Sequence, residues 1–367
     1  MSGSKAPRPT GIQRLQGWKT EPSRKGGLAD CTLIIATYRR PKEILCLLTR
    51  LMEVPDPPGE VVIVDGSPDQ ETQDAIVRWV TDGSMPFELV YVRSPAGLTR
   101  QRNVGIDASS RSFIFFLDDD CLPEAGYFGN IRLVFAEDTA GQVVAVCGSI
   151  INHMGRPLSL KWRLRLLLRL TPSCQGLKYY RNGASGPFSI VAPFVGVRSV
   201  DAVPGGAAAY RRSVFDRHRF SEFFSGYAQG EDLEMSRRIA GDGKLLWCGE
   251  AHVRHLPAAA GRPDWFERGR MKVRNRHFIW KRHLLDATVS DHLRFWSDVL
   301  FLLVCDSVGV TLRPRGWKVR HILGTVWGII GCIFSPPRYE EPPARKAYEV
   351  CLRTLRTRRD AEAPLEG

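Results

Sequence analysis

Residues 113–124 read FIFFLDDDCLPE, a run of bulky apolar residues that ends in the consecutive aspartates Asp118, Asp119 and Asp120. The apolar run 113–117 has the length and character of a strand buried on both faces, as in parallel sheets. Three adjacent carboxylates repel one another unless positive charge lies between them, and Mg²⁺ or Mn²⁺ prefers carboxylate oxygen. A solvated acidic turn would explain a bare triplet, but a buried strand favours a metal site at the ligand-binding edge of an open α/β sheet.

Strands and helices alternate around this run. The expected strands are 32–36, 61–64, 88–92, 113–117 and 143–151, and the expected helices are 42–52, 70–80 and 98–108. This alternation predicts an α/β fold, in which helices flank a mostly parallel sheet with right-handed crossovers. Further along the chain, 161–170 fits either a strand or an interfacial helix, of which we favour the helix; 264–285 reads as a basic amphipathic helix, and 293–334 as two more helices.

Composition divides the chain into four regions. We expect a disordered lead-in over 1–29, a catalytic domain over 30–260, a basic amphipathic helical region over 261–340 and a flexible tail over 341–367. The net charge is +13, and residues 151–220 alone hold 12 Lys and Arg against 2 Asp and Glu. A basic middle of this kind suits phosphates, anionic lipid or nucleic acid.

Cysteines and hydropathy indicate the compartment. No two of the nine cysteines lie within three residues of each other, so there is no zinc or thioredoxin-like pattern, and scattered free thiols fit a reducing cytosol. No uninterrupted apolar stretch reaches the roughly 18 residues of a spanning helix. We therefore expect a cytoplasmic protein with peripheral contact to an anionic membrane, through Trp162 among Lys161, Arg163 and Arg165 and through Trp296, Trp317 and Trp327.

Six strings occur along the chain in a characteristic order: TLIIATYRRP from residue 32, VVIVDGSPD from 61, GLTRQRNVGID from 97, FLDDDCLPE from 116, GGAAAYRRSVF from 205 and GEDLEMSRRI from 230. Each string alone is a loose pattern, but together they resemble the family-2 inverting glycosyltransferases of the A-type fold over about residues 31–285. The resemblance implies metal-dependent transfer of a hexosyl or deoxyhexosyl group from a nucleotide-sugar. The acceptor would be a hydroxyl of a saccharide or lipid-linked saccharide, in cell-surface or exopolysaccharide synthesis.

The resemblance also assigns residues to the donor. It implies that Thr37, Tyr38 and Arg39 line the base pocket, that Asp65 binds base or ribose, and that Arg100 or Arg102 neutralises pyrophosphate. It also implies that Asn103 braces the acids, that Asp118 contacts ribose and that Asp119 bridges or turns away. Asp120 and His255 would bind the metal. Structural alternatives stay open for several of them: an Asx-turn for Asp65, a helix cap for Asn103 and a purely structural imidazole for His255. We interpret Arg40 as solvated charge.

The same resemblance makes Asp232 the general base, with Glu231, Gly206 and Arg211 on the acceptor side. Acids in the first turn of a helix are also favoured by the helix dipole, so simple helix capping is the competing interpretation of Glu231 and Asp232. The small residues at 205–209 would let the backbone approach a sugar closely, or would only pack tightly as a strand.

Other functions fit the sequence less well than transfer of a sugar. A nucleotidyltransferase also uses acid-bound Mg²⁺, but commonly has a Gly-rich, basic loop near its first strand, which is absent here. A glycosidase needs a carboxylate pair without a nucleotide pocket. A basic nucleic-acid-binding protein would interleave aromatic stacking residues with its cations, which the basic middle does not do, so we expect no nucleic-acid partner.

Overall fold

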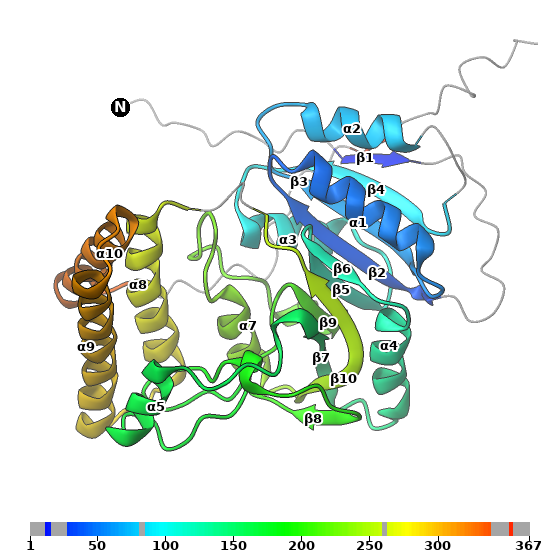
Figure 1. Ribbon diagram of the computed structural model, residues 1–367. Coiled ribbons are helices and arrows are strands. Elements are labelled where there is room, and N and C mark those ends of the chain that lie inside the picture. The colour runs from blue at the N-terminus through cyan, green and yellow to red at the C-terminus, as the bar shows by residue number, and fades with distance from the viewer. Residues whose placement is uncertain (1–11, 16–27, 81–84, 259–262, 339–351, 355–367) are drawn as a thin grey trace, which may run out of the picture.

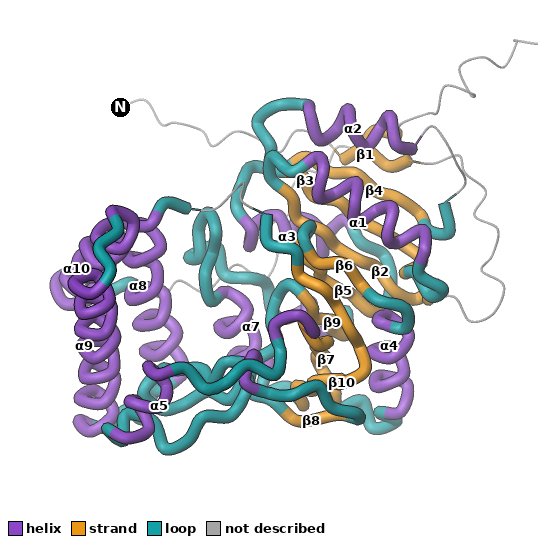
Figure 2. The backbone as a smooth tube through the Cα atoms, in the orientation of Figure 1, coloured by secondary structure: helices purple, strands orange, loops and turns teal. Residues whose placement is uncertain are grey.

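The computed structural model describes residues 12–15, 28–80, 85–258, 263–338 and 352–354. Within these residues one eleven-stranded sheet runs through the molecule in the order β11-β1-β4-β3-β2-β5-β9-β7-β10-β6, with β8 paired to β10 (Figures 1 and 2). Its strands are β1 (Ile12–Leu15), β2 (Leu28–Thr37), β3 (Pro58–Asp65), β4 (Glu88–Arg93), β5 (Phe113–Asp118), β6 (Cys121–Pro123), β7 (Val143–Ile150), β8 (Val197–Ser199), β9 (Ala207–Arg211), β10 (Lys244–His255) and β11 (Leu352–Thr354).

Helices cover both faces of this sheet, and further helices lie beyond it. They are α1 (Pro41–Glu53), α2 (Glu71–Val80), α3 (Leu98–Ala108), α4 (Tyr127–Glu137), α5 (Leu160–Leu167), α6 (Val214–Arg217), α7 (Glu231–Ile239), α8 (Trp265–His283), α9 (Val289–Leu312) and α10 (Gly316–Phe334), with short 3-10 turns η1 (Ile151–His153) and η2 (Phe188–Ile190). The expected strands and helices are all present, and 161–170 contains a helix, α5, capped by the hydroxyl of Ser159. The α/β fold class is confirmed.

The predicted ends of the chain fall mostly outside the described residues. Within the lead-in 1–29, Ile12–Leu15 forms β1, which pairs with β4, and Leu28 already belongs to β2. Within the tail 341–367, only the strand Leu352–Thr354 is described.

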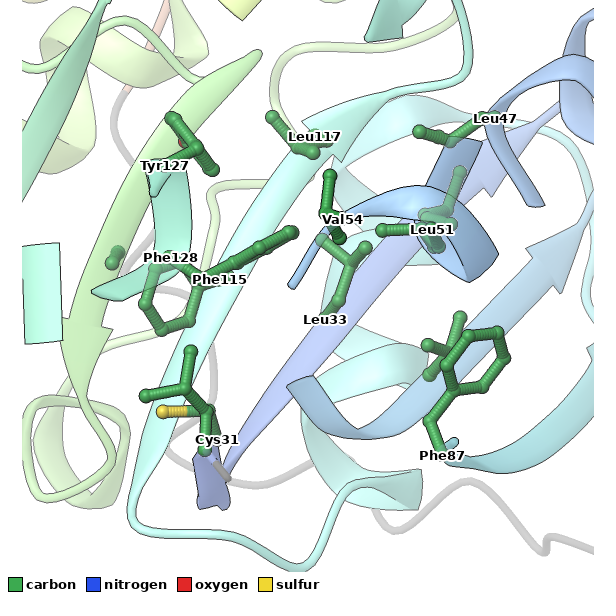
Figure 3. Packing of buried hydrophobic residues seen from close by; sticks show 14 of the residues in the cluster. Cys31, Leu33, Leu47, Leu51, Val54, Phe87, Phe115, Leu117, Tyr127 and Phe128 are labelled. Atoms are coloured by element: carbon green, nitrogen blue, oxygen red, sulfur yellow. The ribbon is translucent and has the colours of Figure 1, made fainter. Parts of the chain in front are cut away.

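The four neighbours β4, β3, β2 and β5 are parallel, and they alternate their side chains between two apolar layers. Leu33 and Phe115 pack beneath α1 and α4 (Figure 3), whereas Ile34 and Phe116 pack beneath α3. Burying each such side chain stabilises the fold by about 1.5–3 kcal/mol. Gly105 lets α3 lie close to the sheet, since a Cβ there would come within 2.4 Å of Ile34. Both packed faces hold the carboxyl ends of these strands at one fixed edge.

Helices α8, α9 and α10 form a separate layer beyond α7, away from the sheet (Figure 1). Two carboxylates on the inner side of α9 tie it to the domain. Asp298, fully buried, binds Arg165 of α5 at 2.7 Å and Arg276 of α8 at 2.6 Å. Asp306 binds Lys272 at 2.9 Å and also Lys161. By length and composition alone, α9 is long and apolar enough to cross a membrane, which the uninterrupted-stretch criterion did not predict.

Candidate active site

A cavity of about 450 Å³ opens where β2 and β5 end and α3 begins. Its lining includes residues from four separate segments of the chain: Thr37, Tyr38, Arg40, Gly97, Leu98, Gln101, Asp118, Asp119 and Tyr227. The volume is in the range that binds small organic ligands. The cavity brings together four of the residues assigned to the donor from sequence, namely Thr37, Tyr38, Asp118 and Asp119.

The two arginines after β2 have opposite surroundings. Arg39 has a left-handed backbone, with φ of 54°, and its side chain is 57% exposed beside Asp69. Arg40 turns inward, where its side chain is 14% exposed and its Nη1 lies 2.6 Å from Asp119 Oδ1 and 3.6 Å from Asp120 Oδ2. The interpretation of Arg40 as solvated charge is therefore wrong. It supplies the positive charge between two of the three adjacent aspartates, and the cavity lining includes Arg40 rather than Arg39.

Asp119 is held inside the protein. Its Oδ2 accepts a hydrogen bond from Thr37 Oγ1 at 2.8 Å, while its Oδ1 accepts one from Arg40. Burial raises the pKa of Asp119 to about 6, although Arg40 and Thr37 oppose the shift. The protein itself therefore binds both oxygens. The resemblance left open whether Asp119 bridges or turns away, and this geometry matches the turned-away orientation.

A group that could hold a metal ion lies beside the aspartates. Ligand atoms of Asp120, Cys121 and His255 all lie within 4.8 Å of one another. The antiparallel pairing of β6 with β10 sets Cys121 opposite His255, which explains how residues so distant in sequence meet. His255 Nε2 lies 3.4 Å from Asp120 Oδ1, and the amide of Ala258 donates to Asp120 Oδ2 at 3.0 Å.

The chemistry of this donor set fits a hard divalent cation. Burial would raise the pKa of Asp120, but His255, the Ala258 amide and Arg40 outweigh it and lower that pKa, which favours the ionised carboxylate. Burial and the three aspartates raise the pKa of Cys121 well above its usual range, so its thiol is a poorer ligand. Asp120 and His255 are therefore the candidate metal ligands. Nothing in the sequence around Cys121 had singled it out, because a lone cysteine has no ligand spacing.

A second charged cluster adjoins the cavity through Asp118. Arg102, 3% exposed, donates from Nη1 to Glu231 Oε1 at 2.5 Å and from Nη2 to Asp118 Oδ1 at 3.2 Å. Asp232 lies close enough to influence both Arg102 and Glu231 electrostatically. One buried cation thus binds two carboxylates and lies near a third. Burial first, and then the charges of Asp232 and Asp118, raise the pKa of Glu231 to about 8 against the opposing effect of Arg102.

Asp232 is not the N-cap of its helix. That position belongs to Gly230, which has a left-handed φ of 91° and no side-chain cap bond. The amide of Gly205 donates to Asp232 Oδ2 at 3.1 Å, and the amide of Leu233 donates to Oδ1 at 2.8 Å. The carboxylate is half-buried and held in one orientation beside the Arg102 cluster.

The glycine pair 205–206 makes this close packing feasible. A Cβ on Gly206 would lie 2.6 Å from Asp118 Oδ2, and one on Gly205 would lie 2.5 Å from Arg102 Nη1. Side chains at these two positions would displace both charged groups. Gly206, expected on the acceptor side, therefore lies directly against Asp118.

Several residues assigned from sequence lie elsewhere. Arg100 pairs with Glu222 at 3.2 Å, so Arg102 is the arginine that reaches the acids. Asn103 is buried and exchanges two hydrogen bonds of 2.9 Å with the backbone of Phe220 instead of contacting the acids. Asp65 is fully buried and accepts from the Ser67 amide at 2.8 Å and from Tyr91 Oη at 2.6 Å, as in the Asx-turn alternative.

Arg211 requires a correction. Strand β9 runs antiparallel to β5, so Ala207 pairs with Leu117 near the acids, while Arg211 pairs with Phe113 at the opposite end. There Arg211 binds the Val143 carbonyl at 2.8 Å and Asp138 at 3.0 Å. Arg211 therefore lies away from the site and cannot be an acceptor contact.

Gln101 is a site residue that sequence reasoning missed. Its amide nitrogen donates at 2.8 Å to the carbonyls of both Thr37 and Val64 and so joins the ends of β2 and β3. No sequence signal distinguishes it from other helical glutamines.

The fold and these two charged groups define an α/β protein with a ligand cavity at the carboxyl edge of its sheet, and comparison with known proteins identifies the family. The family model Glycosyl transferase family 2 matches residues 32–219, just over half of the chain. The protein therefore belongs to glycosyl transferase family 2. This membership favours a glycosyltransferase over the nucleotidyltransferase alternative. No curated protein matches the sequence significantly.

Solved structures support the same fold. The mannosyltransferase PcManGT from Pyrobaculum calidifontis, in complex with GDP-Man and Mn²⁺, is similar with a TM-score of 0.51 at 17% identity, over 86% of this chain and 90% of that one. GalNAc-T7 with UDP, GalNAc and Mn²⁺ is similar with a TM-score of 0.52 at 12% identity, over 86% of this chain and 59% of that one. At these identities the likeness establishes the A-type glycosyltransferase fold.

Proposed function

We propose that the protein transfers a sugar from a nucleotide-sugar to a hydroxyl of a saccharide or lipid-linked saccharide, with inversion at the anomeric carbon. One observation carries the proposal. Asp118 lines the 450 Å³ cavity and at the same time binds Arg102, which binds Glu231 beside Asp232. A donor in the cavity would therefore lie next to the carboxylate that receives the acceptor proton.

The donor half of the site supports a nucleotide diphosphate. Tyr38 and Leu98 offer apolar surface for a base, and Asp118 offers a carboxylate to ribose hydroxyls. Asp120 and His255 would hold Mg²⁺ or Mn²⁺, the ion type present with two of the structural neighbours. When bound, such an ion offsets the charge that develops on a leaving diphosphate.

The acceptor half supports general base catalysis. Asp232 takes the proton of the acceptor hydroxyl as its oxygen bonds to the anomeric carbon, while the bond from that carbon to the diphosphate oxygen breaks. Attack opposite the leaving group inverts the configuration. The Gly205 amide orients Asp232, and Arg102 offsets the negative charge that Glu231 and Asp118 bring to the site. Alignment of donor and acceptor supplies much of the remaining rate enhancement.

We place the reaction in the cytoplasm, in the synthesis of cell-surface or exported polysaccharide. Eight cysteines of the described residues are free, which agrees with a reducing compartment. The basic segment before α7 suits an anionic acceptor or acceptor carrier.

A panel of nucleotide-sugars with Mn²⁺ or Mg²⁺ tests the proposal. We expect one donor to raise the melting temperature and to be turned over, with both effects lost in excess chelator and restored by added metal. Asp120→Asn should behave like the chelated enzyme. Full turnover in excess chelator would contradict the metal assignment, and NMR detection of a product with retained anomeric configuration would contradict inversion.

A further inference from the structure

The outer helices α9 and α10 each present an exposed apolar stripe. We call these ten residues the α9–α10 face; their side chains are 42% to 83% exposed, and they recur at intervals of three, four or seven positions: Leu293, Leu300, Val304, Val308 and Leu312 on α9, and Val319, Leu323, Trp327, Ile330 and Phe334 on α10. The spacing puts each set on one side of its helix. The two helices pack against each other at the periphery of the molecule (Figure 1). Two exposed apolar stripes on neighbouring helices are a candidate interaction site.

Two acidic residues in the body of α9 point the other way. Asp298 and Asp306 both face the domain, where they bind cations of α5 and α8. A spanning orientation of α9 would carry these ion pairs, and the helices that supply the cations, into hydrocarbon at high cost. The inward charges and the outward apolar stripe fit a helix that lies on a bilayer surface rather than across it.

The charge around the face selects the partner. Residues 307–338 contain no Asp or Glu, but contain Arg313, Arg315, Lys318, Arg320 and Arg338. Arg313 and Arg315 are exposed in the turn that joins the two helices. Apolar side chains bordered by cations are complementary to anionic lipid, whereas a second copy of the same face would bring like charges together. We propose that the α9–α10 face docks on the surface of an anionic lipid bilayer.

This surface differs from the one expected from sequence. Trp162 is only 9% exposed and packs with Tyr180, while the guanidinium of Arg165 lies 4.6 Å from its ring centroid. Trp296 is half-buried. Of the tryptophans expected at the membrane, Trp327 lies within the α9–α10 face, and Trp317 lies near the arginine turn with 38% exposure.

Docking also has a consequence for the acceptor, and this consequence rests on the proposed function. A cavity of about 380 Å³ lies between α5, α8 and α9, with Leu302 of α9 and Gly230 both in its lining. Gly230 directly precedes Glu231 and Asp232. On the docked protein this cavity would lie between α9 and the start of α7, close to the chain position of Asp232.

Sedimentation of the full chain with vesicles tests the docking without requiring activity. The variant Leu300→Ser/Val304→Ser/Trp327→Ser is compared with Leu133→Ser, which changes a 55% exposed leucine on α4. We expect the wild type to sediment with phosphatidylcholine–phosphatidylglycerol vesicles more than with phosphatidylcholine alone, and less as salt rises. The triple variant should bind at least about tenfold more weakly, because apolar burial is lost, while Leu133→Ser binds normally.

Two further measurements complete the design. Arg313→Gln/Arg315→Gln should lose most of the preference for anionic vesicles, and melting curves of all variants should match the wild type because the changed side chains are exposed. Absence of wild-type binding at low salt, or normal binding by the triple variant, would overturn the proposal. A wild-type dimer that the three serines dissociate, without vesicle binding, would assign the face to a second copy of the chain instead.

Discussion

Acid clusters in two regions of this protein differ in their charge balance. In the helical layer, Asp298 binds two cations and Asp306 binds two others, so each of these acids is amply neutralised. At the edge of the sheet, the buried cation Arg102 binds both Asp118 and Glu231 and also lies near Asp232. The layer carries surplus positive charge, whereas the site carries surplus negative charge.

The pKa values follow this difference. Lys161 and Lys272 outweigh the effect of burial and lower the pKa of Asp306, whereas burial and two neighbouring acids raise the pKa of Glu231 to about 8 despite Arg102. Balanced ion pairs hold a helix in place. An unbalanced set, costly for the fold, is characteristic of sites that bind cations or transfer protons. The comparison therefore separates structural from functional carboxylates, and substitutions in both regions test it.

The largest expected effect is that of Asp232→Asn. The substitution keeps shape but removes the proton acceptor, so turnover should fall by roughly 10²–10⁴ fold, while donor affinity and the melting temperature change little. Steady-state kinetics and donor titration measure the two. Asp216→Asn, an exposed acid on α6, serves as the control. Near-normal turnover would support a purely structural role at the start of α7, since Asn serves helix termini about as well as Asp.

Asp298→Asn probes the balanced region. It leaves Arg165 and Arg276 without a counter-charge, so we expect the free energy of unfolding to fall by about 3–5 kcal/mol, with turnover per folded molecule unchanged. Asp286→Asn is the matched control, because that carboxylate is 76% exposed beside Arg181 and should cost at most about 1 kcal/mol. Urea denaturation gives both values. A loss of turnover without loss of stability would erase the distinction between the two regions.

Gly206→Ala tests the close approach of backbone to Asp118. The added Cβ would lie 2.6 Å from Asp118 Oδ2, so we expect a loss of about 1–3 kcal/mol of stability together with weaker donor binding. Gly241→Ala, where a Cβ would meet no heavy atom within 4 Å, should be tolerated. Equal melting temperatures and donor affinities for both variants would mean that the structure at Gly206 has room for a Cβ.

Glu231→Gln tests the unbalanced charge through pH. Because the folded-state pKa of Glu231 is raised from 4.5 to about 8, the folded protein holds a proton that the unfolded chain releases in this range. Its contribution to stability is complete below pH 4.5 and is lost as the pH rises toward 8. The variant should therefore lose less stability than the wild type between these values. Parallel stability curves from denaturant titrations across this window would show that Glu231 is ionised throughout.

Local sequence patterns predicted the strands, the helices and the acidic end of β5 well. The buried run before Asp118 implied a central parallel strand, and β5 is that strand; the helix expected over 98–108 coincides with α3. Period-two and period-3.6 hydrophobicity report burial directly, so short-range sequence suffices for these features. The ordered strings likewise identified the family that the comparisons establish.

Such local patterns did not predict which residues from distant segments pair with each other. The sequence predicted Arg40 to be surface charge and Arg102 to be a candidate phosphate ligand. Packing of α1 and α3 on the sheet directs Arg40 at Asp119 and Arg102 at Asp118. Arg211 was misplaced because the direction of β9 determines which of its ends adjoins the acids. Strand direction is decided by pairing between distant segments.

The amino-acid sequence by itself determined the alternation of elements, the acidic end of β5 and the family, because these depend on neighbours along the chain. Only the tertiary structure decided which cation neutralises which carboxylate, how Cys121 and His255 come to lie opposite each other, and which sides of α9 and α10 remain exposed. These features depend on strand order and helix packing, in which residues more than a hundred positions apart become neighbours.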